Sequence, residues 1–243
     1  MTSHGHRPLG LIPPKVSPLE DSRLLKLDLR HVRADELHPV PAAKDWWEET
    51  GAWKADPYGN DVYGNCAPVS LANAIDSACI LNGFPSPITT EGVLDFYWSI
   101  TGGRDVGTYY SEVFERARTV GLCGVKIEAA VAFDWRDQRM CDVANGLFGG
   151  ALYGASLCAA DQTAEIWDAV PGEDATPWGA HGISVQSMSP GMDAAKTWGE
   201  RKNLTPRWRD ARVFEAHVVL IAGLPAPSGL NLAQLRADLE ALR

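Results

Sequence analysis

The segment covering residues 66–83 carries the strongest secondary-structure signal in this chain. Apolar side chains recur along it at a spacing of three to four residues, which places them on one helical face. Pro68 stands in the first turn, where its missing N–H costs nothing, and an Asn-Gly pair closes the segment. These features predict a helix whose first residue is Cys66, directly after a glycine-rich loop.

Helical patterns fill the first half of the chain, and strand patterns follow in the second half. Further helices are predicted over residues 90–100 and 108–120, the latter closed by Gly121 at a position that favours a left-handed residue. Runs punctuated by Gly and Pro predict strands over residues 151–158, 181–188, 192–198 and 213–222. Helices followed by strands indicate an α+β fold.

The chain divides into three parts. Residues 1–40 contain several prolines and charges with little periodicity, which predicts an extended N-terminal arm that packs across a surface. Residues 41–224 have the apolar content of one domain with a single core. Residues 225–243 combine a Pro- and Gly-containing linker with a leucine stripe, which predicts a C-terminal amphipathic helix that either docks on the body or binds a protein partner.

Composition argues against several classes of function. The 243 residues carry a net charge of −9 without a basic cluster, so nucleic acid is not an expected partner. No run approaches the roughly 20 apolar residues that span a bilayer, and the start lacks the apolar core of a signal peptide, so we expect a cytoplasmic protein with no membrane partner. Five separated cysteines without a CxxC pair predict free thiols rather than disulfides or a zinc site. No sequence feature requires a cofactor.

A thiol at the start of a helix is a candidate nucleophile. The unpaired N–H groups and partial positive charge of a helix N-terminus lower a thiol pKa, and the thiolate is the reactive form. The loop before Cys66 contains Gly59 and Gly64, which allow close approach of a substrate, and it offers the Cys66 N–H and the Asn60 amide as oxyanion donors. A second interpretation stays open, because a free cysteine is most often a small buried apolar residue.

Two histidines lie in predicted strands. His181 stands at the entry to its strand, where firm backbone support can hold the imidazole against a neighbouring element. His217 is flanked by apolar residues inside a predicted core strand, and we interpret it as a packed histidine. His4 and His6 lie near the N-terminus and are interpreted as solvated side chains.

These motifs together resemble the papain-like cysteine peptidases. An Asp-Trp and a Gly-Ala between residues 41 and 53, the glycine-rich loop, a helix-opening Cys66, Gly179-Ala-His181 and Thr197-Trp198-Gly199 follow the family's order. The segments at residues 60–66 and 105–108 also resemble papain-like proteins encoded by bacteriophages and prophages. The resemblance implies a nucleophile helix packed on a C-terminal antiparallel sheet or barrel, a thiolate–imidazolium pair of Cys66 and His181, and Asn60 at the position of the family's oxyanion glutamine.

Two positions depart from the family's pattern. Lys196 stands where the peptidases have the Asn that precedes Ser-Trp-Gly, and a lysine cannot accept a hydrogen bond from His181. Thr197, which has a hydroxyl acceptor, is therefore the candidate that orients the ring, while Asp193 lies farther back and is a weaker candidate. Asn60 is one methylene shorter than glutamine, which predicts a weaker oxyanion site.

The resemblance leaves three functions open. The first is a cysteine hydrolase of the peptidase or amidase type, in which Cys66 attacks a peptide or other amide-containing substrate and His181 transfers the proton. The second is a catalytically decayed papain-like module that serves as a structural or binding protein of a phage virion or tail, which Lys196 and the terminal segments favour. The third is a transferase or deamidase, because an amine can resolve the same acyl-enzyme.

Overall fold

The computed structural model describes residues 7–33, 44–51, 56–189, 191–225 and 229–242. His4, His6, residues 41–43 and residues 52–53, which belong to motifs of the sequence, lie outside the described residues. The boundary expected at residue 40 also lies outside them.

One sheet forms the centre of the described structure. Its strands follow the order β2-β8-β3-β5-β6-β7-β4, and β1 pairs with β5. Every pairing is antiparallel except that of β4 with β7. The strands are β1 Lys44–Asp45, β2 Ile127–Ala132, β3 Ala151–Cys158, β4 Ile166–Trp167, β5 Pro177–Ser189, β6 Met192–Thr197, β7 Glu200–Leu204 and β8 Val213–Ile221.

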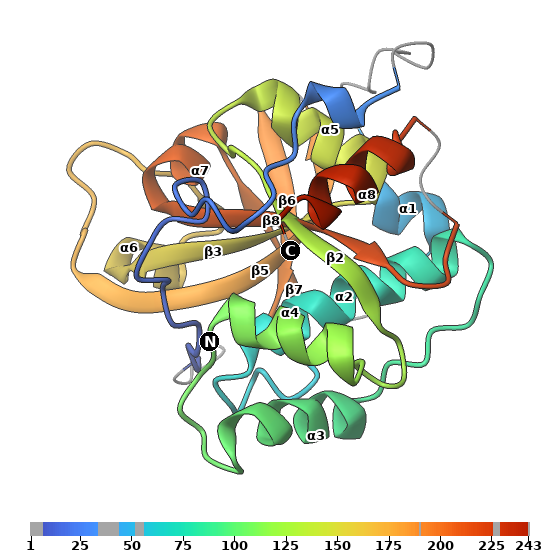
Figure 1. Ribbon diagram of the computed structural model, residues 1–243. Helices are drawn as coiled ribbons and strands as arrows, with labels where there is room; N and C mark the ends of the chain where they lie inside the picture. Colours follow the sequence, from blue (N-terminus) through green and yellow to red (C-terminus); the bar gives the residue numbers. More distant parts are fainter. Residues whose placement is uncertain (1–6, 34–43, 52–55, 190, 226–228, 243) are drawn as a thin grey trace.

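Helices cover both faces of this sheet (Figure 1). They are η1 Leu29–His31, α1 Trp46–Thr50, α2 Cys66–Leu81, α3 Thr90–Thr101, α4 Tyr110–Thr119, α5 Gln138–Phe148, α6 Ala159–Thr163, α7 Pro206–Arg212 and α8 Leu232–Glu240. Alternation along β3 separates two cores, because successive strand residues point to opposite faces. Leu152 packs with residues of α2, α3 and α4, whereas Tyr153 packs with residues of α5, α7 and α8.

Most predicted elements are present, and the fold class is confirmed. The helix expected over residues 66–83 is α2, and the strand expected over residues 151–158 is β3. The helix expected from residue 108 begins at Tyr110, because Thr108 instead exchanges backbone hydrogen bonds with the arm. Gly121 has the expected left-handed backbone, with φ of 97°.

The expected separation of helices from strands is wrong in the second half. Helices α5 and α7 alternate with strands there, and β7 was not predicted. The sequence of β7, Glu-Arg-Lys-Asn-Leu, is polar because its first four residues are exposed or half-buried. An exposed strand of this kind carries no apolar alternation for a sequence pattern to detect.

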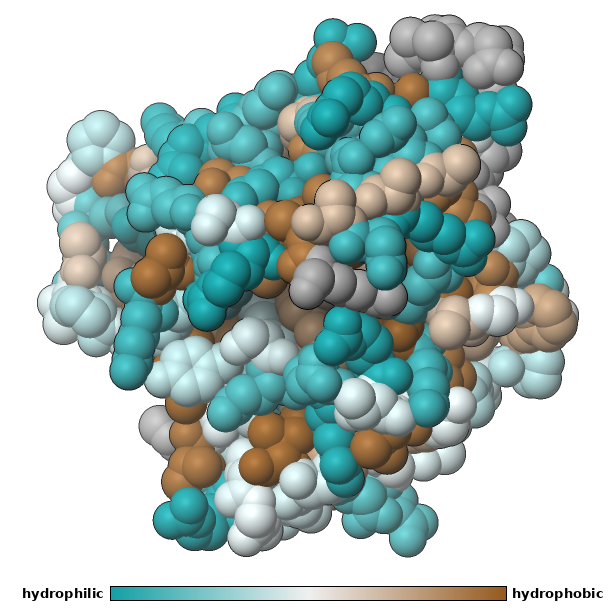
Figure 2. All heavy atoms as spheres, viewed as in Figure 1, coloured by the Kyte–Doolittle hydropathy of each residue, from teal (hydrophilic) through white to brown (hydrophobic). Residues whose placement is uncertain are grey.

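The C-terminal helix docks on the body of the protein. Leu235 of α8 is fully buried. The carboxylate of Asp238 lies 3.0 Å from His31 Nε2, within hydrogen-bonding distance. Arg236 forms an ion pair with Glu128 of β2. Polar side chains cover much of the face seen in Figure 2, and its apolar side chains occur in scattered patches.

Candidate active site

Cys66 is the first residue of α2, and its sulfur faces strand β5. Helix α2 packs against β5, so the Gly182 N–H donates to Cys66 Sγ at 3.3 Å. Gly182 directly follows His181 in the chain. A Cβ at Gly182 would lie 3.2 Å from the Ala67 backbone, a tight contact, so glycine favours this close approach of strand and helix. The sulfur of Cys66 therefore contacts the backbone of β5 one residue after His181, and the pairing of the two side chains stays a prediction.

The imidazole of His181 is held by the two residues that end strand β6 and begin the following turn. Strand β6 pairs with β5, and the distance from Thr197 Oγ1 to His181 Nε2 is 2.5 Å. The indole of Trp198 stacks on the imidazole, with 4.2 Å between ring centroids and 16° between ring planes. His181 Nδ1 is buried without a hydrogen-bond partner among the described residues. Thr197 thus bonds to Nε2, which leaves Nδ1 able to accept a proton.

Lys196 and Asp193 make contacts elsewhere. The ammonium of Lys196 lies 5.3 Å from the centre of the Tyr58 ring, in a cation–π contact with the glycine-rich loop. Asp193 pairs with Arg209 of α7 at 3.0 Å, and burial raises the pKa of this carboxyl to about 6. Asp193 therefore pairs with α7 rather than with His181. Thr197 lies beside the imidazole.

Asn60 is buried in the glycine-rich loop, six residues before Cys66. Its side-chain Nδ2 donates to the Tyr63 carbonyl at 3.1 Å, which closes the turn of the loop. An amide nitrogen carries two hydrogens, so one donor remains after this bond. The use of that donor toward an oxyanion stays a prediction.

A small hydrogen-bond network fixes the two glycines that border the site. Asp105 Oδ1 accepts from the Gly64 N–H at 2.9 Å and from the Tyr97 hydroxyl at 2.7 Å. The Tyr97 hydroxyl in turn accepts from the Gly107 N–H at 3.0 Å. Residues 105–108 belong to the sequence resemblance, but no sequence pattern predicts a role for Tyr97.

The N-terminal arm passes directly over Cys66. Gly10 lies so close to Gly64 that a Cβ on Gly10 would stand 1.7 Å from the Gly64 carbonyl oxygen. On the other side, a Cβ at Gly107 would stand 2.3 Å from the Gly10 carbonyl oxygen. Thr108 holds the arm from both directions, since its N–H donates to Gly10 O at 2.8 Å and its carbonyl accepts from Ile12 N at 2.9 Å. Only glycine fits at position 10.

The residues just before Gly10 cover the histidine side of the site. Trp198 Nε1 donates to the Pro8 carbonyl at 3.2 Å. The guanidinium of Arg7 lies 4.9 Å from the centre of the Trp198 ring and forms an ion pair with Glu200 at 2.9 Å. The sequence predicts an arm on the surface but contains no signal that places the arm over Cys66 and His181.

Burial shifts the pKa values of both Cys66 and His181. Cys66 and His181 are both fully buried. Burial raises the pKa of the Cys66 thiol, although backbone N–H groups of Gly182 and Gly10 directed at the sulfur offset part of that rise. Burial, together with the positive charge of Arg7, lowers the pKa of His181 to about 3. Both shifts favour the neutral forms in the buried site, and the thiolate–imidazolium pair stays a prediction.

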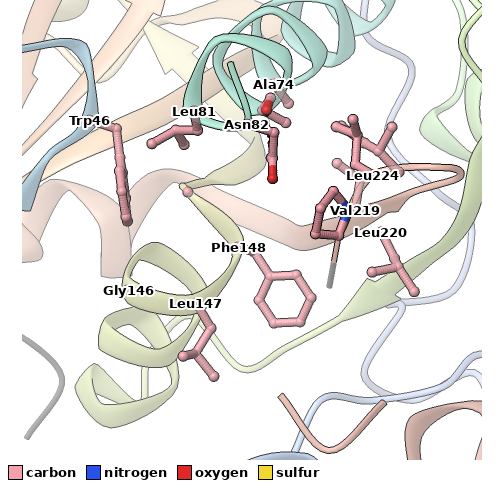
Figure 3. Close-up of a pocket in the computed structure, with 14 residues that line it drawn as sticks. Trp46, Ala74, Leu81, Asn82, Gly146, Leu147, Phe148, Val219, Leu220 and Leu224 are labelled. Atoms are coloured by element: carbon pink, nitrogen blue, oxygen red, sulfur yellow. Dashed lines mark hydrogen bonds between the residues drawn. The ribbon is translucent and has the colours of Figure 1, made fainter. Parts of the chain in front are cut away.

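Other features of the described structure lie away from this site. A cavity of about 260 Å³ sits at the far end of α2, where the labelled side chains of Trp46, Phe148 and Leu224 surround it (Figure 3). All five cysteines are free thiols. The described residues contain no group of three or more His, Cys, Asp or Glu side chains placed to hold a metal ion, and no described helix has the length and apolarity to cross a bilayer.

Solved structures of cysteine proteases share this architecture. Xylellain, a cysteine protease from Xylella fastidiosa, superposes with a TM-score of 0.70 over 88% of this chain and 97% of its own, at 13% identity. The chain has a papain-like fold. Procathepsin L2 from Tenebrio molitor larval midgut gives 0.63 over 90% and 81%, at 15% identity, and procathepsin B S9 from Trypanosoma congolense gives 0.59 over 90% and 87%, at 12% identity. No protein-family model matches the sequence, and no curated protein matches it significantly.

Proposed function

We propose that this protein is a cysteine hydrolase of the peptidase or amidase type and that its own N-terminal arm holds it inactive. The observation that carries the proposal is the contact of Cys66 Sγ with the N–H of Gly182, which directly follows His181 in β5, together with the hold of Thr197 and Trp198 on the His181 ring. A thiol, an imidazole and a ring-orienting group on three different elements make up the machinery of nucleophilic acyl transfer.

The chemistry follows from the free ring nitrogen. His181 Nδ1 accepts the thiol proton, and the Cys66 thiolate attacks the carbonyl carbon of an amide. The Cys66 N–H and the Asn60 amide supply hydrogen bonds to the oxyanion that develops. His181 then gives its proton to the leaving amine as the C–N bond breaks. A water molecule, deprotonated by His181, hydrolyses the resulting thioester and releases a carboxylic acid.

The arm fits the role of an inhibitor. The Gly10 N–H is directed at the Cys66 sulfur, so the arm occupies the approach to the nucleophile. The arm also excludes solvent from both reacting side chains. Displacement of residues 7–12 is therefore the step that makes the site competent.

The origin and location of the protein belong to the same proposal. The segments at residues 60–66 and 105–108 resemble papain-like proteins of bacteriophages and prophages, and we place this chain with them, in the cytoplasm or in a virion. Residues 105–108 include Asp105, which bonds to Gly64, and Gly107, which contacts Gly10 of the arm.

The test uses the full chain with its arm displaced by Gly10→Ala, because the added methyl cannot fit beside Gly64. Unfolded protein and mixed peptides are incubated with this variant, and new amino groups are counted. Hydrolysis should exceed that of the parent chain, while Glu20→Ala, an exposed change elsewhere in the arm, should leave it low. If hydrolysis persists when Cys66→Ser is added to the Gly10→Ala chain, the mechanism is contradicted. If the Gly10→Ala chain shows no hydrolysis although its Cys66 is readily alkylated, the non-catalytic module is favoured.

A further inference from the structure

Lys196 is the departure from the papain-like pattern that the catalytic steps leave without a role. It lies in β6 directly before Thr197, and it is only 3% exposed. A lysine is rarely buried to this extent, because its ammonium loses the solvation of water. Successive residues of a strand point to opposite faces of the sheet. Thr197 reaches the imidazole of His181, whereas the Lys196 ammonium lies 5.3 Å from the centre of the Tyr58 ring. Neighbouring residues of β6 therefore contact the histidine and the glycine-rich loop.

Tyr58 has a backbone conformation that tyrosine seldom adopts. Its φ is 49°, in the left-handed region, and the residue is buried. Such a conformation in a residue other than glycine persists only where the surrounding contacts impose it. The Tyr58 N–H donates to Asp56 Oδ1 at 2.8 Å, and its hydroxyl donates to Asp76 Oδ2 of α2. The Lys196 ammonium adds a third contact, to the ring itself.

Both oxyanion donors of the proposed reaction are tied to Tyr58 over a short stretch of chain. The Tyr58 carbonyl accepts from Asn65 Nδ2 at 3.0 Å, and Asn65 immediately precedes Cys66. Asn65 is fully buried, so this bond fixes the start of α2 relative to Tyr58. Asn60 lies two residues after Tyr58, and its N–H donates to the Pro57 carbonyl at 2.9 Å. A shift of Tyr58 would therefore move the Cys66 N–H and the Asn60 amide together.

We propose that Lys196 positions the oxyanion donors by holding the Tyr58 ring. The proposal rests on the hydrolase function given above, and it gives a role to the residue that otherwise favours a decayed module. The face of an aromatic ring attracts a cation, and the attraction is strongest where water is excluded, as it is at these two buried residues. A misplacement of about 1 Å at a reacting centre can cost about a hundredfold in rate. Lys196 touches no reacting atom and acts through Tyr58.

The first test compares two reactions of the same thiol. Hydrolysis of a peptide passes through a tetrahedral oxyanion, whereas alkylation by iodoacetamide displaces iodide and forms no oxyanion. In the opened Gly10→Ala chain, Lys196→Met keeps the length of the side chain and should lower kcat for hydrolysis about tenfold. KM and the rate of Cys66 alkylation should stay within about twofold. Lys202→Met is the matched control on β7, because it removes an ammonium that lies 5.8 Å from the Trp167 ring instead, and it should leave both rates unchanged.

Two results of this comparison would overturn the proposal. Unchanged hydrolysis in Lys196→Met would show that the oxyanion donors do not depend on the ammonium. A parallel loss of hydrolysis and alkylation would show that Lys196 supports the fold of the whole site rather than the oxyanion donors. A Gly10→Ala chain that is readily alkylated but hydrolyses nothing, before any change at Lys196, would instead contradict the proposed function, and the positioning role would fall with it.

The second test changes the ring, in case Lys196→Met disturbs folding. Tyr58→Phe and Tyr58→Leu both remove the hydroxyl that donates to Asp76, but only the leucine variant removes the ring. In the opened Gly10→Ala chain, the ratio of hydrolysis to alkylation should be about tenfold higher for Tyr58→Phe than for Tyr58→Leu. Adding Lys196→Gln should bring the two ratios together, because no cation then faces the ring. Equal ratios in the presence of Lys196, or a difference that persists without it, would overturn the proposal.

Discussion

Gly10 of the arm lies against Gly64 of the glycine-rich loop so tightly that a Cβ on Gly10 would stand 1.7 Å from the Gly64 carbonyl oxygen. Backbone atoms form both sides of this contact, so no side-chain movement relieves an added methyl. Gly64 itself is fixed by the hydrogen bond from its N–H to Asp105. The contact makes position 10 the point at which the closed state is most sensitive to substitution.

Gly10→Ala should displace the arm from its position over Cys66 and Gly64. The closed chain loses the two backbone hydrogen bonds with Thr108, and overpacking of this kind costs about 1–3 kcal/mol, which corresponds to a fall in Tm of about 2–12 °C. Trypsin cleavage after Lys15 should become faster in the native protein. Glu20→Ala serves as the control and should show the parent chain's Tm and cleavage rate. A Gly10→Ala chain that is equally protected from trypsin would show that the arm tolerates the methyl.

Thr197 is a positioning residue, because it acts through the His181 ring. In the opened Gly10→Ala chain, Thr197→Val should lower hydrolysis about ten- to hundredfold, the effect of losing one hydrogen bond to a buried imidazole. Thr197→Ser keeps the hydroxyl and should restore most of the rate. A purely structural role would leave the pH dependence of Cys66 alkylation unchanged in Thr197→Val, whereas loss of ring orientation should move that profile toward an ordinary thiol.

Acid should loosen the arm. Burial and Arg7 hold the pKa of His181 at about 3 in the closed site, whereas an exposed imidazole has its usual value of 6.5. The open form therefore binds the extra proton, so closure is fully stable above pH 6.5 and loses stability as pH falls from 6.5 toward 3. At pH 4.5 the ratio of open to closed chain should rise about 100-fold. In the closed site burial raises the pKa of the Cys66 thiol, so the thiol is neutral there over this range.

Hydrogen exchange at the amides of residues 9–12 measures this opening, after correction for the intrinsic pH dependence of exchange. Protection should fall between pH 7.5 and 4.5 in the parent chain. In His181→Gln, which has no group that titrates in this range at the site, the fall should be much smaller. An equal loss of protection in both chains would show that groups other than His181 cause the acid opening, such as the carboxylate of Glu200, which forms an ion pair with Arg7.

Cys66→Ser should remove hydrolysis without unfolding the protein. Serine is slightly smaller than cysteine, and its hydroxyl can still accept the Gly182 N–H. In the opened chain the rate should fall by about 10³-fold or more, because the hydroxyl lacks the nucleophilicity of a thiolate. Cys79→Ser is the matched control on the same helix, and it should retain the rate. Thermal unfolding checks that both variants are folded.

Local sequence signals determine the parts of the structure that were predicted well. Helix α2 follows from periodicity, Pro68 and the closing Asn-Gly pair, and all of these lie within 18 residues. The pairing of His181 with Cys66 is a prediction from the family's order of motifs rather than from any local pattern, and the structure brings Gly182, the next residue, to the sulfur. Thr197 was chosen because Lys196 cannot accept a hydrogen bond, and its hydroxyl lies beside the ring.

The covering of the site could not be read from the sequence. Gly10 meets Gly64, Gly107 and Thr108, which are at least 54 positions away, and no periodicity links such residues. The role of Tyr97 was missed for the same reason, since a tyrosine in an amphipathic helix predicts only a core contact. His217 was interpreted as a packed histidine because apolar residues flank it, but its pairing with Glu215 and its place at the border of a cavity were not predicted.

The most direct measurement of the account is the rate of Cys66 alkylation by iodoacetamide as a function of pH in three full-length chains: the parent, Gly10→Ala, and Gly10→Ala with His181→Ala. We expect slow labelling of the parent at every pH, rapid labelling of Gly10→Ala well below pH 8.5, and loss of that low-pH reactivity without His181. Labelling of Gly10→Ala that remains as slow as in the parent, or that matches an ordinary thiol, would contradict a covered and activated nucleophile.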